Sequence, residues 1–179
     1  MNILEKFYRK VIRYDLVNKF SYTKVEEIPK LKKIVLNFGC KNFELKNIAS
    51  ALLSLELITT KRGSLTRAKR SNILLKIREG YPVGCVVILK KTKMYDFFLK
   101  LLVQVFPNLK VFEGISTSKK SEKISFSFTL KDLISFKELE KQFYLFSKLP
   151  PLNITIFSNA KTKKEMLYLM QSFKLPLVF

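Results

Sequence analysis

The sequence predicts one α+β domain over residues 1–179, in which an antiparallel sheet packs against helices. Two patterns indicate this fold class. Apolar residues recur at helical spacing in some segments and alternate with polar residues in others, and the strand-like segments are grouped between the helices. In addition, 47% of the 179 residues are hydrophobic and 13% are aromatic, which is enough to bury a core and too much for a disordered chain.

The first expected element is a helix over residues 2–20. Its apolar residues are expected on one face packed against the core: Ile3, Leu4, Phe7, Val11, Ile12 and Leu16. A helix lying on a membrane surface has a similar pattern, so this second interpretation stays open. Pro29 then precedes an expected strand over residues 31–38, which Gly39 closes.

A second helix is expected over residues 43–57, with Asn42 as its N-cap. Its inner face is expected to hold Leu45, Ile48, Ala49 and Leu52. Residues 57–60 are β-branched or aliphatic and are expected to form a strand that leads to a bend at Gly63.

The second half of the chain begins with an expected strand over residues 85–89 and a helix with Thr92 as its cap and Pro107 as its stop. Residues 116–121 are an expected hairpin tip. A strand follows in which three inward residues alternate with two serines: Ile124, Phe126 and Phe128 with Ser125 and Ser127.

Residues 136–146 are ambiguous and are interpreted as one short helix. A strand over residues 152–157 follows two prolines. The last helix is expected to begin at Thr162 with a capping box to Glu165, and to turn inward Met166, Leu169, Met170 and Phe173.

Charge is the outlying property of the composition. The chain has 34 Lys and Arg against 14 Asp and Glu, so its net charge is +20 and its isoelectric point is about 10.0. Self-repulsion of this size favours a polyanionic partner, which is nucleic acid in the first place and an anionic membrane surface in the second. A general nucleic-acid-binding protein and a membrane-surface protein are therefore both kept as alternatives.

Several residue types that enzymes need are missing from the sequence. There is no His for acid–base chemistry or metal binding, and no glycine-rich phosphate loop or recognisable pair of carboxylates. Cys40 and Cys85 are far apart and have no metal-ligand spacing, so we expect buried thiols in a reducing compartment. The sequence predicts a protein that is not an enzyme and has no cofactor and no metal.

The basic residues concentrate between Lys61 and Lys91, where nine Lys and Arg accompany one acid, Glu79. Spaced cations come first, a short apolar patch follows, and a turn with Gly80, Pro82 and Gly84 leads into the expected strand. Fixed cations on a loop that returns into a buried strand are typical of a nucleic-acid contact surface, although a solvated basic loop has the same composition.

Phrases in this order resemble the bacterial-type ribosomal protein L-five family, whose members hold 5S rRNA in the central protuberance of the large subunit. The phrases span nearly the whole chain: Ile28-Pro-Lys30, Lys33-Ile-Val-Leu-Asn-Phe-Gly39, Leu65-Thr-Arg-Ala-Lys-Arg-Ser71, Ile77-Arg-Glu-Gly-Tyr-Pro-Val-Gly-Cys85, Met94-Tyr-Asp-Phe97, Phe112-Glu-Gly-Ile-Ser116 and Lys174-Leu-Pro176. The resemblance implies an α+β fold with an antiparallel sheet and a structural, RNA-binding role in translation.

The resemblance also implies three groups of contact residues and their partners. The residues expected to contact 5S or large-subunit rRNA are Lys33, Asn37, Lys61, Arg62, Thr66, Arg67, Lys69 and Arg70. Those expected to face the P-site tRNA are Ser71, Asn72, Ile73, Leu74, Leu75, Lys76, Arg78 and Gly80. Those expected to bridge to a head protein of the small subunit are Phe112, Glu113, Gly114, Ile115 and Ser116. Neighbouring proteins of the central protuberance are further implied partners.

Some positions depart from the family pattern. Leu75 replaces an aromatic residue of the tRNA-facing loop, Glu113 stands where Arg is common, and Lys119, Lys120 and Lys123 replace an acidic, glycine-rich hairpin. Only six of the basic residues are Arg, and Phe, Ile, Leu and Asn are abundant, which indicates a coding sequence drifted towards A and T. With no transit peptide or membrane span expected, this favours a mitochondrially encoded copy, with the plastid and the bacterial cytoplasm as alternatives.

Overall fold

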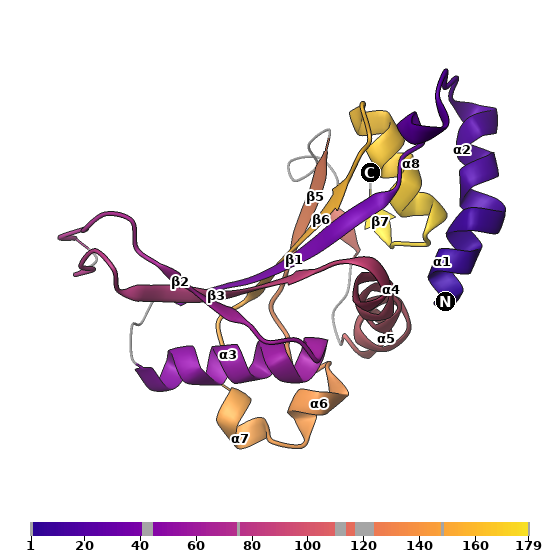
Figure 1. Ribbon diagram of the computed structural model, residues 1–179. Helices are drawn as coiled ribbons and strands as arrows, with labels where there is room; N and C mark the ends of the chain where they lie inside the picture. The colour runs from indigo at the N-terminus through magenta and orange to yellow at the C-terminus, as the bar shows by residue number, and fades with distance from the viewer. Residues whose placement is uncertain are drawn as a thin grey trace. The chain divides into compact units, whose positions relative to one another are not determined.

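The computed structural model describes residues 2–40, 45–74, 76–109, 114–116, 124–147 and 149–178. Its main sheet has five strands in the order β2-β3-β1-β6-β5 (Figure 1). Hydrogen bonds between β2 and β3, and between the ends of β5 and β6, run in the antiparallel sense. The α+β class with an antiparallel sheet is thus confirmed. The strands are β1 Leu31–Gly39, β2 Ser64–Arg67, β3 Pro82–Leu89, β5 Ser125–Leu130 and β6 Leu152–Ser158.

The chain forms two compact units. Unit 1 comprises Met1–Ile34, Leu89–Phe128 and Thr155–Phe179, and unit 2 comprises Val35–Ile88 and Thr129–Ile154. Because β1, β3, β5 and β6 each contribute residues to both units, four covalent connections are strands of the sheet.

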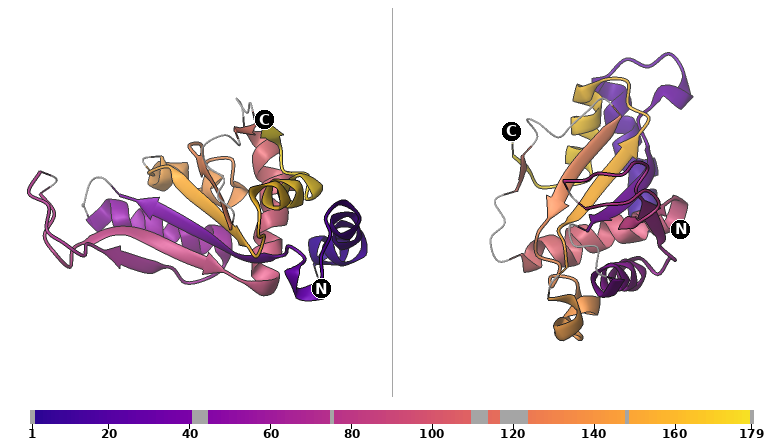
Figure 2. Two further views of the ribbon diagram at one scale, coloured as in Figure 1. Left: turned by 90° about the horizontal axis from the view of Figure 1, so that it is seen from above. Right: turned by 90° about the vertical axis from the view of Figure 1, so that its left-hand side faces the viewer.

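Unit 1 contains the helices from both ends of the chain and the helix after β3. They are α1 Ile3–Phe7, a π-helical turn Tyr8–Ile12, α2 Arg13–Lys19, a 3₁₀ turn Val25–Glu27, α4 Lys91–Lys100, a π-helical turn Leu101–Val105, α5 Phe106–Asn108 and α8 Lys163–Ser172. The N-terminal helical segment lies beside α8 (Figures 1 and 2), where Tyr8 stacks on Phe173 at 6.1 Å and Phe20 meets Tyr168 edge-on at 5.8 Å. A short parallel pair, β4 Ile115–Ser116 and β7 Leu177–Val178, completes the unit.

The N-terminal segment is helical as predicted, but only part of its apolar face is buried. Leu4, Ile12 and Leu16 are buried, whereas Ile3 is 71% exposed and Val11 is 41% exposed. Successive helical positions differ by about 100°, so residues at 3 and 4 or at 11 and 12 do not share one narrow stripe. The π-helical turn also shifts the register of the second half.

Two other predictions in unit 1 need correction at helix ends. Lys90, not Thr92, occupies the N-cap of α4 and makes no side-chain cap bond. Pro107 does not stop the helical segment, since it occupies the first turn of α5, where a missing N–H has no consequence. The capping box of α8 is confirmed because Thr162 accepts a hydrogen bond from the Glu165 N–H. All four residues predicted to turn inward from α8 are buried.

Unit 2 packs one long helix, α3 Leu45–Thr59, against the sheet and against two short helices, α6 Lys137–Glu140 and α7 Phe143–Phe146 (Figure 1). The ambiguous stretch is thus two short helices rather than one. The predicted cap Asn42 lies outside the described residues. The inner face of α3 is Ile48, Ala51, Leu55 and Ile58, so the predicted inward positions Leu45, which is 78% exposed, and Ala49 were wrong.

The predicted strand over residues 57–60 was also wrong, because α3 continues to Thr59. Ile58 is only 2% exposed, and the Thr59 hydroxyl donates to the Leu55 carbonyl at 2.6 Å. Burial of this last turn in the core therefore overrides the strand preference of its β-branched residues. The strand begins later, at Ser64, within the basic segment.

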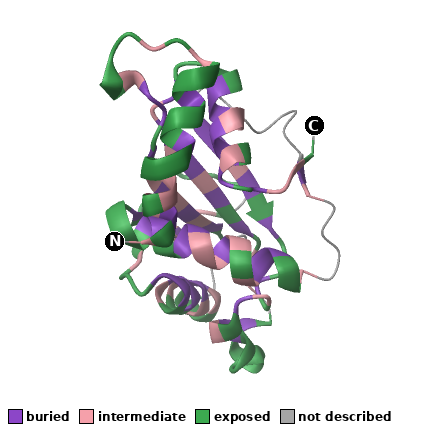
Figure 3. Cartoon of the chain, turned by 90° about the vertical axis from the view of Figure 1, so that its right-hand side faces the viewer, coloured by how far each residue is buried: buried purple, intermediate pink, exposed green. Residues whose placement is uncertain are grey.

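The sheet has one covered face and one more open face. Buried and half-buried positions alternate along β1 and β6 (Figure 3). In unit 1 the covered face meets the helices, as shown by Phe128 beside Phe106 at 6.0 Å between ring centroids. In unit 2 the covered face meets α3, where Cys85 lies against the Ile48 carbonyl. Polar and basic side chains occupy the open face.

Candidate nucleic-acid interface

The candidate site is built on the antiparallel pair of β2 and β3 in unit 2. Thr66 pairs with Gly84 and Arg67 with Pro82, and the register shifts between Thr66 and Arg67. Gly84 is required here, because a Cβ atom at this position would lie 2.2 Å from the Phe38 carbonyl oxygen of β1. Close approach of three strands thus fixes the base from which the basic residues project.

The segment between the two strands is a laddered hairpin rather than an irregular loop. Ala68 N–H donates to the Tyr81 carbonyl at 2.8 Å, and Gly80 N–H donates to the Ala68 carbonyl at 3.0 Å. Asn72 and Ile77 exchange two backbone bonds of 2.8 and 3.0 Å. A turn closed by Lys76 N–H on the Ile73 carbonyl forms the tip, with Lys76 at φ 53° and Gly80 at φ 82°. We call residues 61–81 the basic hairpin.

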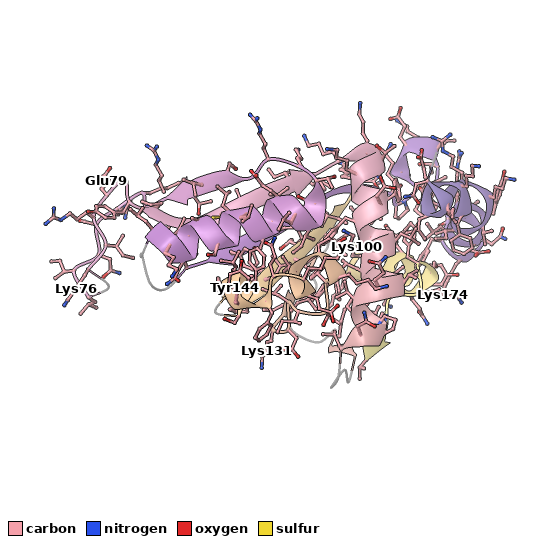
Figure 4. All side chains as sticks on the ribbon, turned by 90° about the horizontal axis from the view of Figure 1, so that it is seen from below. Lys76, Glu79, Lys100, Lys131, Tyr144 and Lys174 are labelled. Atoms are coloured by element: carbon pink, nitrogen blue, oxygen red, sulfur yellow. The ribbon has the colours of Figure 1, made fainter. Side chains whose placement is uncertain are left out.

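Most cations of the basic hairpin are exposed and have no acidic partner. Within the described part of the chain, no carboxylate pairs with the exposed side chains of Arg62, Arg67, Lys69, Arg70, Lys76 and Arg78. Figure 4 shows Lys76 and Glu79 projecting from this hairpin. Lys61 differs, because its ammonium group donates to the Ile88 carbonyl at 2.6 Å and so braces the segment against β3. The arrangement holds a row of free positive charges on a hydrogen-bonded frame.

The tip of the basic hairpin carries two apolar side chains that nothing in the described part of the chain covers. Ile73 is 92% exposed and Leu74 is 94% exposed. Such exposure is unusual for adjacent aliphatic residues and is typical of a contact surface. Leu75 lies outside the described residues.

The remaining predicted contact residues fall into three places. Asn37 is half-buried on β1 in unit 2, on the same face of that strand as Lys33. Lys33 belongs to unit 1, and its ammonium group lies 4.6 Å from the centre of the Phe157 ring. The structure therefore does not gather all eight predicted rRNA residues into one unit.

Two of the predicted bridge residues, Phe112 and Glu113, lie outside the described residues, as do Lys119, Lys120, Lys123 and most of the predicted hairpin tip at 116–121. Gly114 has φ 92°, and a Cβ there would lie 2.4 Å from Val178. Ile115 is 7% exposed and its N–H donates to the Pro176 carbonyl at 2.9 Å. Ile115 thus anchors this segment to the C-terminal strand and is not itself a contact surface.

Sequence reasoning missed Phe157, the half-buried aromatic beneath Lys33. A signal was present in the pattern of β6. Leu152, Ile154 and Ile156 alternate on the covered face, so Phe157 must point to the open face with Thr155. A large aromatic residue in that phase is a departure from the expected polar position.

The described residues include no group of three or more His, Cys, Asp or Glu side chains placed to hold a metal ion. Both thiols are buried, as predicted, and burial with a smaller contribution from Cys40 raises the pKa of Cys85 to about 11. A cavity of about 430 Å³ in unit 1 is lined by Tyr8, Tyr95 and Arg13 among others, and its Arg9 is paired with Glu5 at 2.7 Å. None of the described helices combines the length and the apolar composition needed to span a membrane.

Comparison with known proteins gives a consistent set of relatives. Residues 82–177 match the family model that describes the C-terminus of the ribosomal protein L-five family, whose members are also named uL5. The large ribosomal subunit protein uL5m of Reclinomonas americana is 38% identical over 179 residues, covering 99% of this chain and 98% of that protein. The bacterial proteins named uL5 from Nitrosomonas europaea and Desulforapulum autotrophicum are 35% and 38% identical, covering 97% and 98% of this chain and the same shares of their own lengths.

Proposed function

The chain belongs to the uL5 family of large-subunit ribosomal proteins, and from this premise we propose that it anchors ribosomal RNA through its basic hairpin. Its relatives are structural components of the ribosome and not enzymes. The observation that carries the proposal is the row of unpaired cations fixed on the β2–β3 frame.

This arrangement suits folded RNA. Proteins meet RNA helices mainly through phosphates, 2′-hydroxyls and shape, because side chains cannot read the deep major groove. Arg67 and Arg70 can each hold a phosphate with two parallel hydrogen bonds, and the laddered frame keeps them in place before binding. Roughly six to ten such contacts would make the affinity fall about 10³–10⁵-fold between 50 and 200 mM salt.

The finer parts of the proposal follow from family membership and from the hairpin geometry. The hairpin base holds 5S rRNA or a large-subunit rRNA segment in the central protuberance. The tip, residues 71–80, reaches the P-site tRNA with Lys76, Arg78 and the exposed pair Ile73 and Leu74. Because Ile73 and Leu74 offer no π-face, the tRNA contact rests on charge, backbone groups and apolar contact rather than on stacking.

We further propose that the segment containing Gly114 lies near a head protein of the small subunit and that other central-protuberance proteins are neighbours. The family includes a mitochondrial member and bacterial members of similar identity. The A- and T-rich composition supports the mitochondrial ribosome as the location, with a plastid or bacterial ribosome as the alternatives.

Co-sedimentation tests the proposal directly. A tagged chain expressed in its host should sediment with the large ribosomal subunit, and RNA recovered with it after partial nuclease digestion should include a 5S-sized species or one defined large-subunit rRNA segment. Recovery of random RNA fragments in proportion to their abundance would support a general nucleic-acid-binding protein instead.

A membrane-surface role is the second candidate, and one observation favours it. The outer side of the N-terminal helical segment exposes Ile3, Val11, Tyr14 and Val17, with basic residues beside them. A helix of this kind binds anionic lipid through apolar burial and charge. Co-sedimentation with phosphatidylserine vesicles, and none with ribosomal subunits, would select this role.

A further inference from the structure

Phe157 is an aromatic side chain on the open face of the sheet in unit 1. Its neighbours on β6, Ile156 and Ser158, are buried, whereas Phe157 and Thr155 are half-buried. The apolar ring therefore contributes little to the core that lies on the other face. A half-exposed phenylalanine in a sheet is a ready stacking surface for a nucleobase.

A cation covers this ring. The Lys33 ammonium lies 4.6 Å from the ring centroid, which is within the range of a cation–π interaction. No carboxylate pairs with Lys33 in the described part of the chain. The ring quadrupole is a weak partner for an ammonium group, since exposed cation–π pairs are worth less than a charge-assisted bond to a phosphate oxygen.

The surroundings of the ring are polar, neutral and regular. Ser127 donates a hydrogen bond to the Thr155 hydroxyl at 3.1 Å, and Ser158 N–H donates to the Ile124 carbonyl at 2.9 Å. The same register places Ser125 opposite Phe157 on the neighbouring strand. Among the described open-face positions of β5 and β6 in unit 1 there is no acid, so Lys33 sets the local sign of charge.

We propose that Lys33 and Phe157 form a binding site for one unpaired rRNA base and its phosphate. The inference rests on the proposed rRNA-binding function and adds a second RNA contact, in unit 1, to the basic hairpin of unit 2. The Lys33 ammonium leaves the ring for a phosphate oxygen, and the base stacks on the ring in its place. The Thr155 hydroxyl is placed to bond the ribose or the base edge.

The site commits to nucleic acid because both of its parts are needed for one nucleotide. The cation takes the phosphate, and the ring takes the π-face that every base offers. An acidic protein segment would satisfy Lys33 but would leave the ring without a partner. The net charge of +20 complements a polyanion over the whole chain.

Two measurements on the full-length protein test the site. In the first, total rRNA from the host large subunit is the probe in filter binding, and the variants are Phe157→Leu, Phe157→Tyr and Tyr144→Leu. Leucine keeps the apolar bulk without a stacking face, tyrosine keeps the face, and Tyr144 is an exposed aromatic on α7 that serves as the matched control (Figure 4).

The expected result is that Phe157→Leu weakens rRNA binding about 5- to 100-fold, the range of one base–aromatic stack, while the slope of affinity against salt stays unchanged. Phe157→Tyr and Tyr144→Leu should bind like the wild type. Equal binding by Phe157→Leu and the wild type would overturn the site but leave the proposed function standing. If the wild-type protein itself shows no preference for rRNA over other polyanions of equal length, the proposed function fails.

The second measurement needs no variant to bind. In the free wild-type protein, the aromatic ring current should shift the ε-methylene protons of Lys33 upfield in the NMR spectrum. Addition of uridine oligonucleotides should return this resonance to the ordinary lysine position, because the ammonium leaves the ring. An upfield resonance that persists at saturating oligonucleotide would contradict the exchange of partners.

Discussion

The carbonyl oxygen of Phe38 lies where a side chain at Gly84 would begin, 2.2 Å from the position of its Cβ. This close approach joins β1 to β3 directly beneath the basic hairpin. The glycine is therefore a structural requirement of the RNA-binding frame and not a site of flexibility, since its φ lies outside the left-handed region.

Gly84→Ala should accordingly destabilise the fold. The methyl group must displace backbone, which over-packed positions accommodate at about 1–3 kcal/mol or more. Gly39→Ala is the matched control, because nothing lies within 4 Å of its Cβ position. Urea unfolding should show a lower midpoint for Gly84→Ala and a change of less than about 0.5 kcal/mol for Gly39→Ala. Equal midpoints for the two variants would argue against the tight contact.

The hairpin tip should separate stability from function. Because Ile73 and Leu74 are almost fully exposed, changing both to Ser should alter the free energy of unfolding by less than about 0.5 kcal/mol. The same variant should reduce crosslinking of the protein to P-site tRNA in reconstituted ribosomes. Val103→Ser, at another exposed apolar position, should leave that crosslinking unchanged. A large loss of stability would show that the tip packs against the chain.

The N-terminus of α8 depends on a reciprocal cap. Thr162 accepts from the Glu165 N–H at 3.2 Å, and Glu165 accepts from the Lys161 N–H at 3.0 Å. Thr162→Ala should lower the free energy of unfolding by about 1 kcal/mol, whereas Thr162→Ser should retain most of it. Thermal unfolding of the two variants checks this, and a similar loss in both would indicate that the Thr162 methyl group, not its hydroxyl, matters.

Burial of tyrosine predicts instability at high pH. Burial is the largest cause that raises the pKa of Tyr95 to about 12, and likewise for Tyr22. In the unfolded chain these phenols ionise near pH 10. Because the unfolded state then loses protons first, the free energy of unfolding should fall from about pH 10 and continue to fall to about pH 12. Tyr95→Phe should reduce this decline, and ultraviolet titration of the native protein should leave two phenols protonated at about pH 11.

The elements with strong periodicity were predictable from the sequence. The stripe of α4 from Met94 to Phe106 and the inward face of α8 follow helical spacing and are buried as expected, apart from the half-buried Leu102. The cap at Thr162 was also predictable because its chemistry is local. The order of helices and strands and the basic segment followed from the same kind of local pattern.

What failed depends on tertiary contacts. The end of α3 at Thr59 and the inward face through Ala51 and Ile58 are decided by what the helix packs against. The cross-strand rungs of residues 68–81 depend on pairing between distant positions and not on local preference. Phe157 was overlooked because its meaning appears only when Lys33, more than a hundred residues earlier, lies over its ring.

The central claim is that the unpaired cations of the basic hairpin bind rRNA phosphates. Its most direct test compares Arg67→Ala with Arg70→Ala against a control pair of equal charge, Lys131→Ala with Lys141→Ala, which are exposed elsewhere in unit 2. Binding to large-subunit rRNA is measured from about 50 to 200 mM salt. We expect the arginine pair to weaken binding and to lower the slope of log affinity against log salt by about two, with little change in the control pair. The same affinity and slope in both double variants would contradict the account.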